Sequence, residues 1–169
     1  MSSHPHHSHD SHAHEHPPSP SEVNQGLADA VAMCEARGTR LTPIRAQVLE
    51  LMLKSGRSLK AYELLEQMQV VHPNSKPATI YRALDFLAEQ GLIHRLDAIN
   101  GWTACQHIHS HHHDLLIVCT VCGMFKELSA PHISQELREL LATVSFSPNA
   151  PETEIRATCD ACRQQSSID

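Results

Sequence analysis

Apolar residues in the segment that begins at Glu22 recur three and four positions apart, the spacing that buries one face of an α-helix. Cys34 falls in the apolar stripe of the first helix and is therefore predicted to be a core residue. Glycine and proline mark helix ends, because glycine tolerates left-handed backbone and proline suits the first helical position. The pattern predicts helices over 22–38, from 43 onward with Thr42 as N-cap, over 61–68, and over 77–91.

Two short strand patterns follow the helices, at 92–96 and 102–106, on either side of Asn100-Gly101. Asn-Gly between strands is a strong signal for a hairpin. Helices followed by a β-hairpin make the winged form of the helix-turn-helix, which is a DNA-binding fold. Farther along, the pattern predicts strands at 115–119, 124–128 and 154–158, and a helix with one apolar stripe at 133–144.

Two Cys-x-x-Cys pairs flank these C-terminal elements and use four of the six cysteines: Cys119, Cys122, Cys159 and Cys162. Two such pairs present four thiolates, which is the ligand set of a tetrahedral structural zinc site. Two disulfides are the alternative. A chain with no visible secretory signal favours metal, because thiols stay reduced inside the cell.

This order of elements predicts an α+β protein. We expect a disordered His-rich tail at 1–21, a winged helix-turn-helix domain at 22–98, a hinge and wing at 99–104, and a small C-terminal α/β domain at 105–169. A domain as small as the last one rarely closes its own core. Structural zinc and dimerisation are therefore both expected to complete it.

Composition excludes a membrane role and leaves nucleic acid open. The longest apolar run, 115–119, is far too short to span a membrane, so a cytoplasmic protein is expected. The net charge of −6 argues weakly against nucleic acid as a partner. However, residues 22–98 hold nine Lys/Arg against nine Asp/Glu, so this half can still present a basic face.

Fifteen histidines are far more than a chain of this length usually carries, and most lie in two clusters. Seven lie within residues 1–16 and five within 107–113. Both clusters suggest metal binding at neutral pH. The first is either a natural metal-scavenging tail or an expression tag, and its irregular spacing favours the natural tail.

Several motifs follow one another along the chain: RLTPIR at 40–45, PATIYRALDFL at 77–87, GLIH at 91–94, HHHD at 111–114, and the two Cys-x-x-Cys pairs. Taken in this order they resemble the ferric uptake regulator family over about residues 22–163, and within it they most resemble the zinc uptake regulator branch. The resemblance implies a homodimeric, metal-activated bacterial repressor with no enzyme activity and no small-molecule substrate.

The fourth predicted helix has the character of a recognition helix. Thr79, Tyr81 and Arg82 lie off its apolar stripe and toward its N-terminal end, the end that enters the major groove. Arg82 can bind guanine with two hydrogen bonds or clamp a phosphate. The other candidate DNA-binding residues, suited to backbone contacts, are Arg45, Lys60 and Tyr62.

A second metal site is implied by the same resemblance, with His94, Cys105, His112 and Glu127 as regulatory zinc ligands. Two imidazoles, a thiolate and a carboxylate suit tetrahedral zinc, and the thiolate favours zinc over ferrous iron or manganese. The spacing before Cys119 departs from the family pattern by one residue. The neighbouring histidines therefore remain alternatives to His112 as the ligand, namely His107, His109, His111 and His113. A third metal site that uses Asp114 or His132 is a weaker alternative.

We therefore expect a repressor of zinc-uptake genes that binds double-stranded operator DNA with two zinc ions per subunit, one structural and one regulatory. A sensor of iron, peroxide or nickel from the same family is the alternative, and Cys105 is the residue that discriminates. A zinc carrier or zinc hydrolase is more distant, because a catalytic zinc needs an open coordination position.

Overall fold

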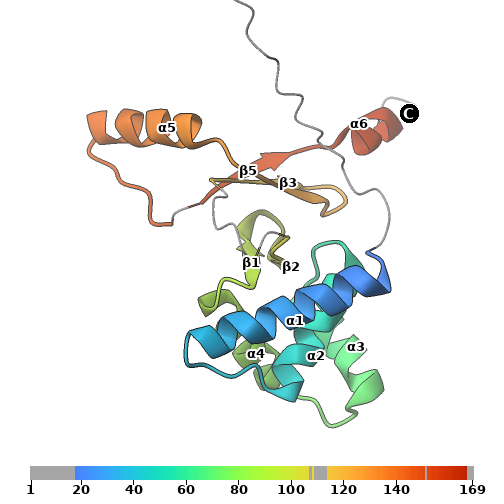
Figure 1. Cartoon of the computed structure of the whole chain (residues 1–169). Coiled ribbons are helices and arrows are strands. Elements are labelled where there is room, and N and C mark those ends of the chain that lie inside the picture. Colours follow the sequence, from blue (N-terminus) through green and yellow to red (C-terminus); the bar gives the residue numbers. More distant parts are fainter. Residues whose placement is uncertain (1–17, 107, 109–113, 151, 167–169) are drawn as a thin grey trace, which may run out of the picture.

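The computed structural model describes residues 18–106, 108, 114–150 and 152–166, which form two lobes stacked end to end (Figure 1). One lobe is a bundle of four helices, and the other is a small sheet carrying two helices. A β-hairpin lies between them. This is the predicted α+β class, with a winged helix-turn-helix followed by an α/β domain.

The helical lobe contains α1 (Pro20–Ala36), α2 (Pro43–Ser55), α3 (Ala61–Val71) and α4 (Pro77–Glu89). α2 and α4 each begin with a proline, as the sequence predicted. α1 begins two residues before the boundary expected for the tail. The reason is a capping box, in which Ser19 and Glu22 satisfy each other's backbone N–H groups. Residues 1–17, most of the expected tail at 1–21, lie outside the described residues, whereas residues 20 and 21 belong to α1.

The core of the helical lobe is apolar throughout and includes Cys34, as predicted. Not every stripe residue is buried, since Val31 and Ile44 are each about two-fifths exposed. The fully buried large side chains come from all three later helices and from the segments that flank them: Val48, Leu49, Met52, Leu59, Leu64, Met68, Ile80, Leu84, Leu87 and Leu92.

The hairpin pairs β1 (Ile93–Leu96) with β2 (Gly101–Ala104) in antiparallel register. The predicted hairpin is therefore present, but Asn100 and Gly101 do not form a two-residue turn by themselves. Leu96 pairs with Gly101, so the connection is a 3-10 turn, η1 (Asp97–Ile99), followed by Asn100 in the left-handed conformation. The longer connection gives the hairpin a broad tip, and this tip rests against the second lobe.

The second lobe is a three-stranded sheet of β3 (Leu115–Cys119), β4 (Phe125–Leu128) and β5 (Thr153–Ala157), in the order β4-β3-β5. β4 is antiparallel to β3 and β5 is parallel to it, with α5 (Pro131–Thr143) as the crossover. A short helix, α6 (Asp160–Ser166), was not predicted, because seven polar and small residues carry no apolar periodicity.

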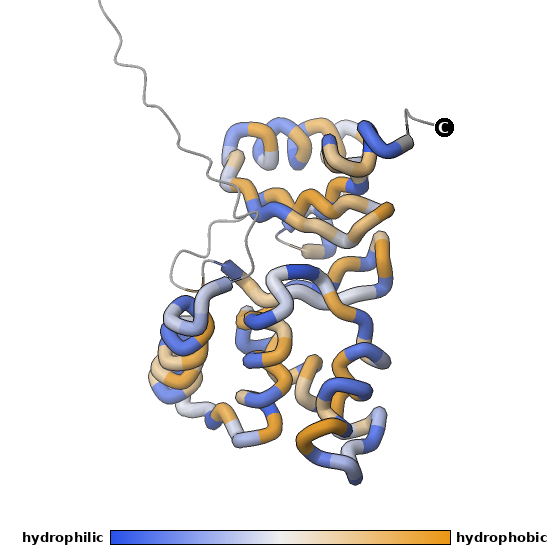
Figure 2. The backbone as a smooth tube through the Cα atoms, turned by 90° about the vertical axis from the view of Figure 1, so that its right-hand side faces the viewer, coloured by the Kyte–Doolittle hydropathy of each residue, from blue (hydrophilic) through white to orange (hydrophobic). Residues whose placement is uncertain are grey.

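The apolar stripe of α5 finds little cover within the described chain. Ile133, Leu140 and Val144 are between 45% and 65% exposed, and Figure 2 shows hydrophobic segments along this helix at the outer end of the molecule. β5 also forms an edge of the sheet, since its only strand partner among the described residues is β3. The second lobe thus leaves an apolar helix face and a strand edge uncovered within the described residues.

The two cores are divided differently from the expected domain boundaries. Leu96, expected in the winged-helix domain, packs with Leu116, Val118 and Phe125 in the core of the sheet. Cys105, expected in the second domain, packs with the helices. The hairpin crosses from one core to the other within a few residues, so neither lobe is closed without the other's contribution.

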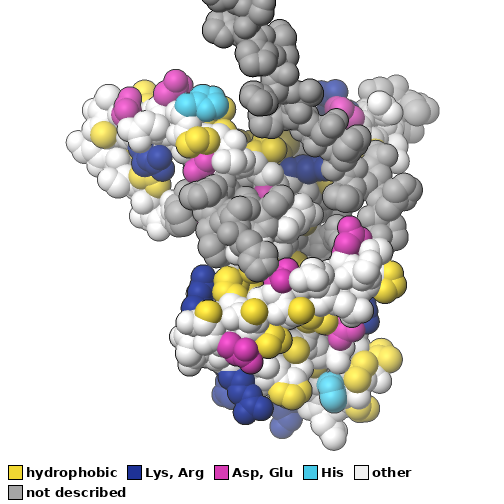
Figure 3. Space-filling model, in the orientation of Figure 1, with side chains coloured by type: hydrophobic (Ala, Val, Ile, Leu, Met, Phe, Trp, Pro, Cys, Tyr) yellow, Lys and Arg dark blue, Asp and Glu magenta, His cyan; other side chains and the backbone are white. Residues whose placement is uncertain are grey.

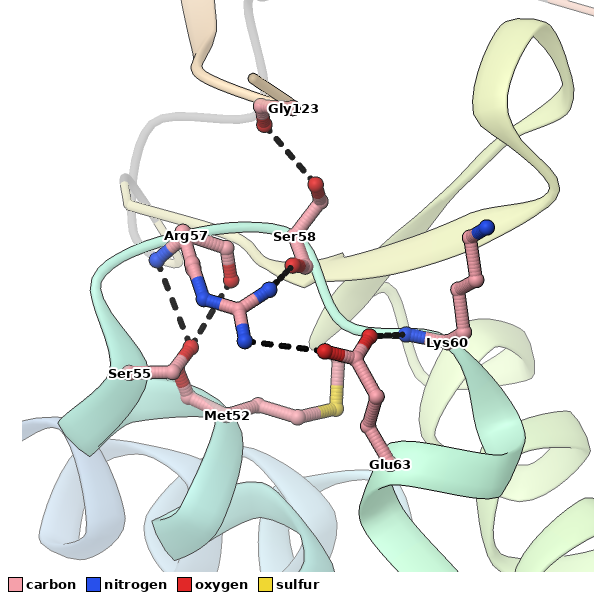
Figure 4. Close-up of polar contacts among 7 residues, drawn as sticks. All are labelled: Met52, Ser55, Arg57, Ser58, Lys60, Glu63 and Gly123. Carbon is pink, nitrogen blue, oxygen red and sulfur yellow. Dashed lines mark hydrogen bonds and ion pairs between the residues drawn. The ribbon is translucent and has the colours of Figure 1, made fainter. Parts of the chain in front are cut away.

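A polar contact also joins the lobes beside the first Cys-x-x-Cys pair. The Ser58 hydroxyl, in the loop before α3, donates a hydrogen bond of 2.8 Å to the carbonyl oxygen of Gly123 (Figure 4). The Arg57 side chain spans the base of this loop, donating to the Ser58 carbonyl and to Glu63. Burial of Glu63 opposes its ionisation, but hydrogen bonds from the Lys60 N–H and from Arg57 lower its pKa.

Gly123→Ala is expected to destabilise the protein more than Gly38→Ala. Both glycines have a left-handed backbone, so alanine at either position costs about 1–2 kcal/mol of strain. An added Cβ at Gly38 meets nothing within 4 Å, whereas at Gly123 it lies 2.6 Å from the Ser58 Oγ. Ser58 must then rotate away, and losing its hydrogen bond adds about 1 kcal/mol.

Urea unfolding at saturating zinc measures both variants against the parent chain. In a Ser58→Ala background the excess cost of Gly123→Ala should disappear, because the two changes share one contact. An excess that persists in that background would place the cost in the Cys119–Cys122 turn itself.

Candidate metal centres and DNA-binding face

The two Cys-x-x-Cys pairs meet at one end of the sheet. Cys119 ends β3, and Cys122 lies in the turn toward β4. Cys159 follows β5, and Cys162 lies on α6. Parallel pairing of β3 with β5 places Cys119 opposite Ala157, so the second pair follows directly beside the first. All four sulfurs lie within 4.8 Å of one another.

The spacing of the sulfurs suits a metal rather than disulfides. The Sγ atoms of Cys122 and Cys159 are 3.7 Å apart, and no disulfide joins any two cysteines among the described residues. A disulfide requires about 2.05 Å between sulfurs. Zinc–sulfur bonds of about 2.3 Å make a tetrahedron with edges of about 3.8 Å, which matches the observed separation.

Backbone amides aim at one sulfur of this cage. The Cys159 N–H lies 3.4 Å from the Cys119 Sγ. Burial opposes ionisation of Cys119, but backbone N–H groups of Cys122, Cys159 and Val121 lower its pKa to about 6. Hydrogen bonds with Cys159 and Cys122 instead raise the pKa of Cys162 to about 12. The lowered pKa favours a thiolate at Cys119, whereas a cation would have to displace the protons of Cys122 and Cys162, whose pKa values are raised.

A second cluster of metal-binding side chains lies between the lobes. His94 on β1, Cys105 just after β2 and Glu127 on β4 bring an imidazole nitrogen, a thiol and a carboxylate within 4.8 Å of one another. The His94 Nε2 is 3.2 Å from the Glu127 Oε1. The Gln106 backbone N–H, 3.1 Å from that same oxygen, orients the carboxylate. Two ligands come from the hairpin and one from the sheet.

The side chains of this second cluster are buried, which strengthens the electrostatic interaction between His94 and Glu127. The Glu127 side chain is fully buried, and only 11% of the His94 side chain is exposed. Burial by itself lowers the pKa of His94, but hydrogen bonds with Cys105 and Glu127 outweigh it and raise the pKa to about 10. A charged imidazole here compensates the buried carboxylate, which would be costly if left unpaired. A divalent cation can take over that role when the imidazole proton leaves.

The predicted fourth ligand, His112, lies outside the described residues, as do its possible substitutes His107, His109, His111 and His113. Asp114, considered for a third site, is already engaged. Its carboxylate accepts a hydrogen bond of 3.0 Å from the Ala130 N–H, where α5 begins. His132 is exposed at the start of α5 and belongs to no metal-binding cluster found among the described residues.

The outer face of α4 is free of the core and carries the predicted DNA-reading residues. Its buried stripe is Ile80, Ala83, Leu84 and Leu87, whereas Tyr81 is 52% exposed and Arg82 is exposed. Thr79 is partly buried in the first turn. Figure 3 shows Lys and Arg side chains gathered at the end of the helical lobe away from the sheet.

The backbone-contact candidates differ in how free they are to reach DNA. Lys60 and Tyr62 are exposed at the start of α3, with the Lys60 ammonium 6.0 Å from the centre of the Tyr62 ring. Arg45 is partly buried, and its side chain contacts other residues of the same lobe. Its guanidinium lies 3.5 Å from the centre of the Phe86 ring and donates to the Arg40 carbonyl oxygen. This contact gives Arg45 a role in positioning α4.

Two residues that join the lobes were missed by reasoning from the sequence, namely Ser58 and Glu154. Ser58 binds the carbonyl of Gly123, and the Glu154 carboxylate binds backbone N–H groups of the hairpin tip. Each lies far along the chain from its partner. The local sequence around a single serine or glutamate does not indicate a hydrogen-bond partner so far along the chain.

No helix among the described residues has both the length and the apolar character needed to span a bilayer.

Comparison with known proteins agrees with the motifs. Residues 36–155 match the ferric uptake regulator family. The zinc uptake regulation protein of Escherichia coli (strain K12) is 36% identical over 138 residues, covering 80% of each chain. A solved structure of a zinc uptake regulator complexed with zinc and DNA superimposes with a TM-score of 0.77 at 34% identity, covering 86% of this chain and 97% of that one.

The crystal structure of holo XcZur is similar in the same way, with a TM-score of 0.71 at 35% identity, covering 83% of this chain and 99% of that one. The predicted resemblance to the zinc branch is thus confirmed, together with the fold class. The motifs, the order of the elements and the matched length agree, and the chain belongs to the ferric uptake regulator family.

Proposed function

We propose that this protein is a zinc-responsive transcriptional repressor that binds operator DNA as a metal-loaded homodimer and shuts off zinc-uptake genes in the cytoplasm. One observation carries the proposal: His94, Cys105 and Glu127 form a cluster of metal-binding side chains that spans the two lobes. Similarity to zinc uptake regulators, one of them solved with zinc and DNA, supports both the metal and the partner.

The position of this cluster explains how metal is coupled to DNA binding. His94 and Cys105 belong to the hairpin that follows α4, whereas Glu127 belongs to the sheet. A cation held by all three side chains favours the arrangement in which the lobes are closed on each other. Its binding energy therefore differs between open and closed forms, which is the condition for allosteric control.

The donor set points to zinc as the signal. A thiolate in the regulatory site favours zinc over the harder ferrous and manganous ions. We propose His112 as the fourth ligand, which would close the site with four protein donors. A closed site of this kind leaves no position for a reacting water, which argues against a hydrolase. The protein is accordingly proposed to have no enzymatic activity and to use two zinc ions per subunit.

The homodimer is proposed to form through the sheet lobe. The uncovered apolar face of α5 and the free edge of β5 lie in one lobe, and a second copy presents the same surface in return. Pairing two copies would repeat the helix-turn-helix about a two-fold axis, as a palindromic operator requires. In this arrangement Thr79, Tyr81 and Arg82 of α4 read the major groove, and Lys60 and Tyr62 contact the backbone.

The function is tested by DNA binding at buffered free metal, comparing the parent chain with Cys105→Ala. The parent chain should bind palindromic AT-rich DNA when zinc is added and release it when zinc is chelated. Cys105→Ala should remain a folded dimer that no longer responds, because it lacks one regulatory ligand. The measurement is a fluorescence-anisotropy titration with zinc and, separately, with ferrous iron.

An unchanged response of Cys105→Ala to zinc would show that this residue serves only the core. A response to ferrous iron at lower free metal than to zinc would identify an iron sensor. Zinc binding with no effect on DNA binding would favour a zinc carrier.

Cys119→Ser should lose the structural zinc and the dimer together. Four thiolates hold the turn after β3 against the start of α6, and metal binding supplies folding energy for so small a lobe. Zinc content and mass in solution measure both properties. Cys34→Ser, a buried thiol of α1 outside both clusters, is the matched control and should keep its zinc. A zinc-free dimer of Cys119→Ser would refute the structural role.

Arg82→Ala should weaken operator binding by about 1–3 kcal/mol if Arg82 reads a base, and should relax the preference at one base pair. The measurement compares the operator with single-base variants at fixed salt. Lys54→Ala removes a positive charge from the end of α2 and serves as the control. A uniform loss on all sequences would reassign Arg82 to a phosphate contact.

A further inference from the structure

One row of residues crosses the sheet and faces the hairpin. Leu116 on β3 pairs with Glu127 on β4 and also with Glu154 on β5. Residues paired in register point to the same side of a sheet. The two carboxylates therefore flank one leucine on the face that is turned toward the helical lobe.

The hairpin meets all three members of this row in order. The Glu127 carboxylate contacts His94 at 3.2 Å. Leu116 packs in one apolar cluster with Leu96, two residues later on β1. The Glu154 carboxylate then accepts hydrogen bonds from the next two backbone N–H groups, those of Asp97 at 2.8 Å and Ala98 at 2.7 Å.

The Glu154 contact is independent of metal, because it joins a carboxylate to backbone amides of the same chain. Each of its two oxygens accepts from a different amide. Hydrogen bonds to an ionised acceptor are about twice as strong as neutral ones. They hold Asp97, which lies only three residues after His94 on a continuous strand and turn.

We propose that Glu154 is a positioning residue for the regulatory metal site. By fixing the tip of the hairpin on the sheet, it keeps His94 within reach of Glu127 and Cys105 before a cation binds. The cation then has less chain to order, so its affinity is higher than in a protein with a free hairpin. This inference rests on the proposed function and adds to it a residue that touches neither metal nor DNA.

The contact is tested first without regulatory metal, by amide hydrogen exchange in a Cys105→Ala background. The Asp97 and Ala98 amides should be protected there. Adding Glu154→Ala should speed their exchange by about tenfold or more, because two hydrogen bonds are lost. Equal exchange with and without Glu154 would overturn the proposal.

The effect on the site is tested by chelator competition, which measures zinc affinity separately from DNA binding. Glu154→Ala should weaken the regulatory site by about tenfold while leaving the four-cysteine site unchanged. Glu154→Gln keeps one acceptor oxygen and should lie between. Glu35→Ala, which removes an exposed carboxylate of α1, is the control. Zinc affinity of Glu154→Ala equal to that control would overturn the proposal.

Operator affinity at saturating zinc shows whether Glu154 only positions the metal site or is needed for folding. Glu154→Ala should then bind DNA within about twofold of the parent chain, because the cation restores the closed arrangement. Loss of DNA binding at saturating zinc in this variant alone would overturn positioning in favour of a structural role. Failure of the parent chain to bind DNA with zinc would refute the proposed function, and the zinc-affinity comparison would still decide the role of Glu154.

Discussion

The β1–β2 hairpin is shared between two hydrophobic cores, and the arrangement of the molecule depends on this sharing. Leu96 completes the core of the sheet, while Cys105 and Ile108 complete the core of the helices. The intervening tip is bonded to β5 through Glu154. A rotation of one lobe against the other must therefore disturb buried apolar contacts and charge-assisted hydrogen bonds together, which makes the hairpin a natural point of control.

Buried charge explains why the second metal cluster lies at this hairpin. The fully buried Glu127 carboxylate needs a positive partner, and the chain offers His94, whose pKa is raised to about 10 by Cys105 and Glu127 against the effect of burial. At the proposed regulatory site, a proton and a cation would compete for one buried position. The protonated state holds the cluster together without metal, and a cation can replace the proton at little cost in buried charge.

The turn between Cys119 and Gly123, which carries part of the four-cysteine cluster, also joins the two lobes. The carbonyl oxygen of Gly123 accepts from Ser58 in the loop that leads into α3. The four-cysteine cluster thus lies where the sheet contacts the loop before α3. The uncovered face of α5 lies in the same lobe, so the proposed metal cage and dimer surface stabilise a lobe too small to be stable alone.

The order of helices and strands was readable from the chain, because amphipathic periodicity, proline at helix starts and glycine at helix ends are local signals. So were the four cage cysteines, whose Cys-x-x-Cys spacing is local as well. The start of α1 at Pro20 and the 3-10 turn at 97–99 were missed. The first depends on a capping box, and the second depends on where the tip docks on the sheet.

The sequence by itself determined the order of the main helices and strands, the four-cysteine set and the family resemblance, but not α6 or the 3-10 turn. Tertiary structure decided which distant residues meet. It brought together His94, Cys105 and Glu127, which only the family resemblance had grouped beforehand, turned Arg45 onto Phe86, and set Glu154 against the hairpin tip. The physical reason is that periodicity and spacing describe neighbours along the chain, whereas contacts across two lobes depend on strand register and packing that no short segment encodes.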